Sequence, residues 1–482
     1  MKLTPSFSET LLNSRWLLPA ALAGALGLGW LAGQAGPAVP GLLIAMPLLV
    51  LFTIVVFYYP RAGFIAYISY CFLINHLSRH VLKVPVGLAM EAILIITWLA
   101  VLFYRSEPPD WRRVQNDLCK LTLVWFVINL LEVVNPAGAS LQGWFYDLRS
   151  NALLWLMTVP LGFLVLRQRR DLNMFIYLVI GFSALGALYG IKQKYLGVDD
   201  MEQYWLNQGA ARTHVLWGKL RVFSGYSEAA QFGNSQAHVA LICLILALGP
   251  YSWQKRLLLA SACLLLLYGM LISGTRGAFF VLVVGILVYL LLSKRLKVLI
   301  LGCLLAGGAF MTLKYTTIGN SNADVFRMRT AVDPNDPSLR VRLANQALLR
   351  EYLSSRPFGG GAGTMGSLGL KYNAGTFLSK VPPDSYFVKV WGQYGIVGFL
   401  IWFGIILFTL GKCAGIVWRI RDPGLRQKLL ALTAGFSGIL LGSYANEIMN
   451  QMPSSMIVYL TWVFILSGPD LDTPRSVAAE NV

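Results

Sequence analysis

The sequence predicts an all-α, polytopic integral membrane protein, and its composition and hydropathy pattern both point that way. Apolar residues make up 56% of the 482 residues and charged residues only 13%, whereas a soluble domain carries about 25% charged residues. Mean hydropathy is +0.61. The apolar residues come in runs of roughly 16 to 23, close to the ~20 that cross a bilayer as a helix. These features exclude a soluble globular enzyme, a disordered regulator and a fibrous protein.

We expect about twelve to fourteen membrane spans, because the third candidate is short enough to be re-entrant. The candidates are 16–34, 39–58, 63–77, 87–104, 118–136, 151–166, 174–191, 236–250, 257–272, 277–292, 296–313, 387–410, 429–446 and 455–468. They divide the chain into N-terminal transmembrane helices (1–191), a first long outer loop (192–235), further transmembrane helices (236–313), a large outer loop (314–386), and C-terminal transmembrane helices with a tail (387–482).

The distribution of Lys and Arg predicts the orientation. Basic residues concentrate in the segments around 105–120, 167–170, 294–297 and 412–428, and the short loops on the other side hold few. Cytoplasmic loops collect Lys and Arg, so both termini are expected in the cytoplasm. The two long loops then face the outer side of the membrane.

Both long loops are basic as well as polar, and the whole chain carries a net charge of +18. One interpretation is a solvated surface, since long loops are partly exempt from the charge rule. The other is a cationic chamber that suits a phosphate-bearing substrate.

The large outer loop contains a predicted amphipathic helix. Asp336-Pro337 supplies an N-cap followed by proline at the first helical position, and Arg356-Pro357 ends the helix. Apolar residues recur between them at helical spacing, at Val341, Ala344, Leu348 and Tyr352. We expect this helix on or near the outer membrane surface.

A glycine run follows that helix, and Gly361-Ala-Gly363-Thr-Met-Gly366 matches the GxGxxG pattern. A dinucleotide site would need a strand before it and a helix after it in a βαβ unit, which this chain does not offer. The run is therefore interpreted as a turn that brings the backbone close to another segment, with a phosphate-binding nest as the alternative.

Five further residues are candidates for chemistry. Arg276, in a tight turn between two spans, either reaches lipid headgroups or presents its guanidinium to pyrophosphate oxygens. Arg221 and Glu228 form either a buried ion pair or a phosphate contact. Asp384 either caps a membrane helix or acts as a general base, and Lys389 lies one turn further on. The histidines and cysteines show no metal-binding spacing, and no nucleic-acid-binding pattern is present.

Three segments, in order, resemble the O-antigen ligase and Wzy-type polysaccharide polymerase superfamily. The first is the turn Ser273-Gly-Thr-Arg276-Gly, and the second runs from Ser338-Leu-Arg340 to Arg356-Pro-Phe-Gly-x-Gly361-x-Gly363. The third is Asp384-Ser-Tyr-Phe through Gly392-Gln-Tyr-Gly395-Ile-Val-Gly398. Many ligases have His-Asn where this chain has Asp384-Ser385, so the resemblance favours a polymerase over a ligase.

The resemblance implies a GT-C-like, metal-independent glycosyltransferase without a cofactor. Its donor would be an undecaprenyl-diphosphate-linked glycan, polymerised into exopolysaccharide or O-antigen on the periplasmic face of the bacterial inner membrane. The diphosphate would contact Arg221, Arg276 and Arg340, and the acceptor hydroxyl would meet Asp384 or, as second choice, Glu228.

The resemblance also implies partners from the same pathway, namely a chain-length regulator and a flippase. Two alternatives stay open. One is a ligase that transfers the glycan to lipid A core, and the other is a transporter or flippase that moves the lipid-linked glycan.

Overall fold

The computed structural model describes residues 38–81, 86–103, 108–138, 140–216, 218–294 and 337–472, together with scattered positions between 300 and 316. Within these ranges the protein is a bundle of helices, as predicted. The predicted span 16–34 and most of the span 296–313 lie outside the described residues.

The helices of the bundle follow the apolar runs closely. In the first half they are α3 (Ala38–Tyr58), α4 (Pro60–His80), α5 (Leu88–Phe103), α6 (Asp117–Leu131), α7 (Leu141–Leu148), α8 (Leu154–Val165) and α9 (Arg169–Tyr195). In the second half they are α12 (Ala229–Ala247), α13 (Trp253–Ile272), α14 (Gly277–Leu292), α20 (Tyr386–Arg419), α21 (Pro423–Ala445), α22 (Ser454–Leu466) and α23 (Gly468–Leu471). Each predicted span within the described ranges coincides with one of these helices or lies within a run of them.

Several of these helices are long and apolar enough to cross a membrane. In the described part of the chain six meet both conditions: 141–165 (α7 and α8 joined by a π-helical turn at Arg149–Leu153), α9, α12, α13, α20 and α21. Shorter apolar helices are Ala45–Tyr58, α5, α14 and α22. The short third candidate, 63–77, is part of the continuous helix α4. The fold class predicted from the sequence is confirmed.

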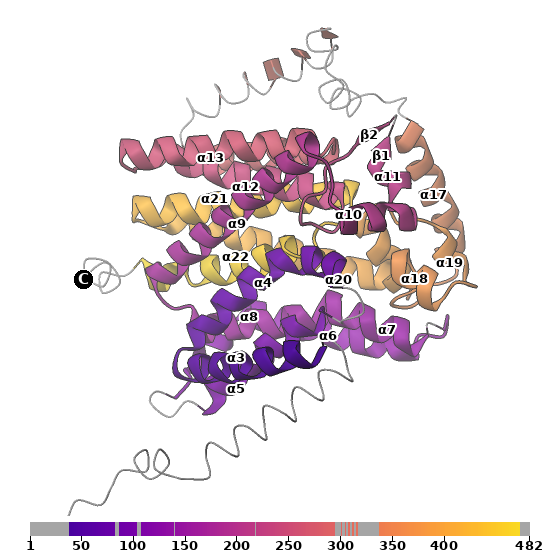
Figure 1. The fold of residues 1–482 in the computed structure, drawn as a ribbon, viewed down its shortest axis with the longest axis horizontal. Helices are drawn as coiled ribbons and strands as arrows, with labels where there is room; N and C mark the ends of the chain where they lie inside the picture. Colours follow the sequence, from indigo (N-terminus) through magenta and orange to yellow (C-terminus); the bar gives the residue numbers. More distant parts are fainter. Residues whose placement is uncertain are drawn as a thin grey trace, which may run out of the picture.

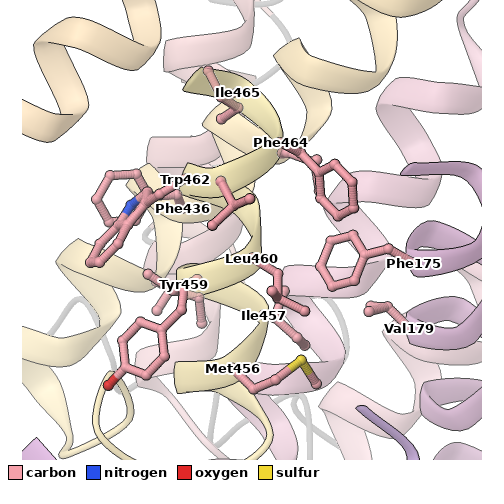
Figure 2. Close-up of a cluster of buried hydrophobic side chains, with 14 of the residues drawn as sticks. Phe175, Val179, Phe436, Met456, Ile457, Tyr459, Leu460, Trp462, Phe464 and Ile465 are labelled. Carbon is pink, nitrogen blue, oxygen red and sulfur yellow. The ribbon is translucent and has the colours of Figure 1, made fainter. Parts of the chain in front are cut away.

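The core of the bundle surrounds α22. This helix is apolar on all sides and its residues are buried, as expected for a helix packed inside a bundle. Figure 2 shows its side chains reaching toward α9 on one side and α21 on the other. Phe464 packs on Phe175 with ring centroids 5.2 Å apart, and Trp462 meets Phe436 edge-on at 5.2 Å.

The predicted inner and outer loops lie at opposite ends of this bundle. The ends of the helices nearest the C terminus are joined by polar contacts, such as Arg169 Nη1 to Asp422 Oδ1 at 3.4 Å and Arg426 Nη2 to Leu292 O at 2.9 Å. The elements of the two long loops gather at the other end (Figure 1). We call this second end the loop end.

Two groups of short elements form the loop end. The first long loop contains α10 (Asp200–Trp205), a π-helical turn (Leu206–Ala210), α11 (Ala211–His214) and a hairpin of β1 (Val215–Leu216) with β2 (Lys219–Leu220), which the sequence did not predict. The second contains α17 (Pro337–Leu353), α18 (Gly366–Tyr372) and α19 (Phe377–Lys380).

Helix α17 confirms the predicted amphipathic helix, but it packs through a different face. Leu349 and Leu353 are buried in a small cluster with Met365, Leu378, Val381 and Val388. The predicted apolar stripe is largely exposed, with Val341 at 56% and Leu348 at 49%. An apolar face directed away from the protein suits a membrane surface.

The glycine run packs against a kink in α20, which confirms its interpretation as a close backbone approach. Gly395 interrupts α20 with φ +64° and ψ −168°, a conformation that essentially only glycine adopts. Gly360 N donates to Gly392 O and Gly361 N to Gln393 O, both at 2.9 Å. A Cβ on Gly359 would collide with the backbone of Gln393. This contact fixes the large loop on the helix that begins after Asp384.

Candidate functional site

The loop end gathers the polar ends of six bundle helices. There α12, α20 and α22 begin, α13 and α21 end, and the turn Ser273–Arg276 leads into α14. The sequence-predicted residues Arg221, Glu228, Arg276 and Asp384 all lie at these helix ends, and Arg340 lies on α17. We therefore describe the site as two groups of side chains, one cationic and one acidic.

The cationic group centres on the contact between Arg221 and the turn before α14. Arg221 Nη2 donates to Thr275 Oγ1 at 3.4 Å, and Nη1 donates to Thr213 O at 2.9 Å. Thr275 Oγ1 in turn donates to Ala229 O at 2.9 Å. Arg276, the next residue, is partly exposed at the start of α14. The fold thus brings Arg221 beside the turn that carries Arg276, although the two are far apart in the sequence.

Small residues allow that turn to lie deep between helices. Gly274 adopts φ +59°, and Ser273 Oγ accepts a hydrogen bond of 3.1 Å from Thr275 N. A Cβ on Gly277 would lie 2.6 Å from Asn446 Nδ2 on the neighbouring turn after α21. The turn therefore has little freedom, and Arg276 starts from a fixed backbone position.

A second network holds the backbone that follows Arg221. Arg79 Nη1 donates to Ser224 O at 2.8 Å, and its guanidinium lies 4.8 Å from the ring of Trp205 and 4.7 Å from that of Phe223. Ser224 N donates to Gln193 Oε1 at 2.7 Å. Ser224 itself has φ +52°, which is uncommon for a residue other than glycine. These contacts fix the path of the chain between Arg221 and Glu228.

Glu228 belongs to the acidic group and stands at the start of α12. Burial raises the pKa of its carboxyl, the nearby Glu447 raises it further, and Arg221 and a hydrogen bond from Gln451 lower it. Ser227 Oγ donates to Gln451 Oε1 at 2.9 Å, which ties this segment to the turn between α21 and α22. Glu228 therefore lies close both to Arg221 and to a second carboxylate, Glu447.

Asp384 lies immediately before α20, but Ser385 is the residue that caps the helix, since its Oγ accepts from Val388 N. Asp384 has φ +41° and remains partly exposed. It lines a small pocket whose other residues are Arg342, Asn345, Gln346, Pro382, Pro383, Ser385 and Val388. Loss of hydration raises the pKa of Asp384, Arg342 lowers it and Glu447 raises it. The N-cap of α20 is therefore Ser385 and not Asp384, so the Asp384 carboxylate can take part in chemistry.

Lys389 and Glu447 connect the two carboxylates. Lys389 Nζ lies 3.0 Å from Glu447 Oε2, with side chains 9% and 21% exposed. Glu447 raises the pKa of both Glu228 and Asp384, so it lies close to each of them. Sequence reasoning singled out Lys389 but missed Glu447. The available signal was an acidic residue in the short turn between the spans 429–446 and 455–468.

The large loop contributes Arg342 to the acidic group, two residues beyond the predicted Arg340. Residues two apart on a helix point to nearly opposite sides. Arg342 faces Asp384, and Arg340 is exposed on α17. Arg221, Glu228, Asp384 and Glu447 are thus linked by contacts or by mutual electrostatic effects. Arg276 adjoins them through Thr275, and Arg340 lies on the same helix as Arg342.

Fold and site together define a polytopic helical membrane protein with cations and carboxylates gathered at one end. Residues 261–403, somewhat less than a third of the chain, match the family model described as O-Antigen ligase. This match confirms the resemblance to the O-antigen ligase and Wzy-type polymerase superfamily. The matched segment contains the Arg276 turn, α17, the glycine run and the first half of α20. Comparison with curated proteins finds no match. Over this segment the chain is accordingly similar to membrane enzymes of the O-antigen ligase and polymerase type.

Proposed function

We propose that the protein is a metal-independent glycosyltransferase that polymerises undecaprenyl-diphosphate-linked oligosaccharide repeats into exopolysaccharide or O-antigen. The reaction would take place on the periplasmic face of the inner membrane, at the loop end. The observation that carries this proposal is the contact between Arg221 and Thr275. It places a second guanidinium next to Arg276, at the end of the bundle that also holds Asp384, Glu228 and Glu447.

The cationic group suits a diphosphate leaving group. When the glycosidic bond to the carrier breaks, negative charge develops on the diphosphate, and fixed cations stabilise it without a leaving-group acid. Charge-assisted hydrogen bonds contribute about 1.5–3 kcal/mol each. In the proposal Arg221 and Arg276 hold the diphosphate, and Arg340 reaches it from α17.

The acidic group suits the acceptor. The attacking sugar hydroxyl must be oriented and must lose its proton, and a carboxylate within hydrogen-bond reach performs both tasks. A raised pKa makes a carboxylate a better base than an ordinary aspartate. Asp384 is our choice for this role and Glu228 the second choice, and Glu447 with Lys389 positions both.

In the proposal, the diphosphate and the attacking hydroxyl are held by different sets of helices. Arg221 and Thr275 lie on the side of α12 and α14, and Asp384 with Arg342 lies on the side of α17 and α20. The scissile bond would lie between them, near Glu228 and Glu447. The new glycosidic bond forms at the anomeric carbon, the carrier diphosphate leaves as an anion, and the hydroxyl proton passes to the carboxylate.

Ligation is the second candidate, because the matched family model carries the description O-Antigen ligase. A ligase would use the same donor and transfer the glycan to lipid A core. The presence of Asp384-Ser385, where many ligases have His-Asn, favours the polymerase.

The test uses the purified full-length protein in liposomes with an undecaprenyl-diphosphate-linked repeat. The proposal predicts longer glycans, with one free undecaprenyl diphosphate released for each new glycosidic bond. Glycan transfer only after addition of lipid A core would identify a ligase. Movement of the lipid-linked glycan across the bilayer without a new glycosidic bond would contradict the proposal and identify a transporter.

A further inference from the structure

An open aromatic pocket lies at the loop end, apart from the charged side chains. It has a volume of about 450 Å³ and is lined by Leu141, Gln142, Trp144, Phe145, Tyr146 and Tyr372. All of these residues except Tyr372 belong to α7, and Tyr372 is the last residue of α18. Figure 1 shows α7 and α18 side by side at the end of the bundle opposite the C terminus.

The pocket contains a stacked pair of rings with a third ring beside it, and we call these three rings the platform. Cations lie over the pair, with the Arg149 guanidinium 5.6 Å from the ring centroid of Tyr146 and the Lys371 ammonium 5.0 Å from that of Tyr372. Tyr146 and Tyr372 stack with centroids 5.3 Å apart and an interplanar angle of 10°, and Phe145 stands next to Tyr146 at 6.0 Å and 70°. Phe145 is 49% exposed and Tyr146 42% exposed. Aromatic faces carry partial negative charge, and the C–H bonds on a face of a pyranose ring present partial positive charge to them.

The platform is held rigidly. Asn373 Nδ2 donates to Gly363 O at 2.9 Å, and Asn373 Oδ1 accepts from Ser140 N at 2.8 Å, so this one buried amide joins α7, α18 and the glycine run. Trp144 Nε1 donates to Asn129 O at 2.9 Å. A rigid aromatic surface binds a ligand with little loss of conformational entropy.

Helix α18 connects the platform to the carboxylates. A Cβ on Gly366, the first residue of α18, would lie 3.6 Å from Glu447 Oε1 and 3.7 Å from Pro383 Cγ. The helix has 7 residues and ends at Tyr372 in the pocket. At ~1.5 Å per residue it spans roughly 10 Å. The pocket therefore lies roughly the length of α18 away from Asp384 and Glu447. It is on the side of the site that holds these carboxylates, and Arg221 is on the other side.

We propose that this pocket is a subsite for the acceptor saccharide, in which a sugar ring one or more residues removed from the reacting hydroxyl packs against Phe145 and the exposed edges of the stacked pair Tyr146 and Tyr372. Phe145 and the edges of the stacked pair supply the apolar contact surface, and the Gln142 amide provides hydrogen-bonding groups for sugar hydroxyls. The inference rests on the proposed function for the nature of the ligand. An acceptor is favoured over a donor because the pocket adjoins the carboxylates and lies away from the cationic group.

The test measures saccharide binding and glycan transfer separately, with full-length protein in nanodiscs. The binding probe is the soluble oligosaccharide released by mild acid from the lipid-linked glycan of the cells that make the protein. Variants are Tyr372→Ala, Tyr146→Ala and Tyr372→Phe, together with Phe145→Ala at the most exposed of the three rings. Tyr58→Ala, on the 67% exposed Tyr58 at the far end of the bundle, is the matched control.

We expect Tyr372→Ala, Tyr146→Ala and Phe145→Ala to weaken probe binding about tenfold and to raise the acceptor KM by a similar factor, with kcat within about twofold. Tyr372→Phe and Tyr58→Ala should bind like the unaltered protein. Probe binding that is absent in the unaltered protein, or unchanged in all three pocket variants, overturns the subsite. Binding that depends on the pocket without any bond formation supports the subsite and contradicts the proposed transferase. Normal transfer with an unchanged acceptor KM in the variants contradicts the proposed subsite but leaves the proposed transferase intact.

Discussion

Lys389 Nζ lies 3.0 Å from Glu447 Oε2, and this ion pair joins the first turn of α20 to the turn that follows α21. Both residues lie where helices meet at the loop end. Glu447 also raises the pKa of Asp384 and of Glu228. The ion pair of Lys389 with Glu447 therefore affects both the stability of the bundle and the electrostatics of the site.

Breaking this pair is predicted to destabilise the protein. Lys389→Met leaves a carboxylate without its cation, and Glu447→Gln leaves a mostly buried ammonium. Each change should cost about 2–4 kcal/mol, somewhat below the ~3–5 of a fully buried pair. The double variant should be more stable than the sum of the single losses predicts. Thermal unfolding of the four proteins in detergent measures this coupling.

The control for that cycle is the pair of Lys412 and Asp117 at the opposite end, with side chains 33% and 51% exposed. Its loss should cost at most about 1 kcal/mol. The account would be contradicted if both ion pairs changed the free energy of unfolding equally, or if the effects of Lys389→Met and Glu447→Gln were strictly additive. Either result would show that the buried pair contributes no more to stability than an exposed one.

The pH dependence of transfer is predicted to report on Asp384. Loss of hydration and Glu447 raise its pKa, so activity should fall on acidification at a higher pH than for an ordinary aspartate. Glu447→Gln removes a repelling charge and should move this acid limb to lower pH. Arg342→Ala removes an attracting charge and should move it to higher pH. Profiles of kcat against pH measure both, and shifts in the same direction would exclude Asp384 as the titrating base.

The kink of α20 is predicted to be essential for folding of the large loop. A side chain on Gly395 would collide with Pro357 O and Gly359 N, and the backbone conformation alone costs about 1–3 kcal/mol for another residue. Gly395→Ala should sharply reduce the yield of monodisperse protein. Gly404→Ala, in the same helix with open space around it, should be neutral or stabilising by up to about 1 kcal/mol. Similar yields of the two variants would contradict this account of the kink.

Much of the fold could be predicted from the sequence, because a membrane span is determined locally. An apolar run of sufficient length predicts a helix whatever its neighbours are, and α9, α13 and α21 fall where the runs fall. The kink at Gly395 could not be predicted in this way. It depends on Pro357 and the glycine run reaching α20 from another part of the chain.

The site was less predictable, because it depends on how helices are rotated and packed. The segments with Arg221, Arg276 and Asp384 could be chosen by residue type and position at span ends. The role of Arg342, rather than Arg340, in facing Asp384 depends on the rotation of α17. Glu91 also shows this dependence on packing. It is an acidic residue within a predicted span, and it accepts two hydrogen bonds from Arg149 on a different helix segment, at 2.8 and 2.6 Å.

The backbone around Ser224 is predicted to position Arg221. Arg79→Met removes the hydrogen bond to Ser224 O and should raise the donor KM about tenfold while the protein still accumulates in the membrane. Ser224→Gly should be tolerated, since glycine adopts φ +52° without strain, whereas Ser224→Val should behave like Arg79→Met. Donor titrations with the purified variants test this. An unchanged KM in both Arg79→Met and Ser224→Val would separate this network from the diphosphate site.

The central claim is that guanidinium groups at the loop end hold the carrier diphosphate during sugar transfer. Its most direct test is the rate of polymer formation by purified Arg276→Ala and Arg276→Lys with an undecaprenyl-diphosphate-linked repeat, at equal protein in the bilayer. We predict at least a hundredfold loss in Arg276→Ala, about 2.7 kcal/mol of transition-state stabilisation, and a large loss in Arg276→Lys, because lysine lacks the planar fork. Polymer formation by Arg276→Ala at a rate near that of the unaltered protein would contradict the account.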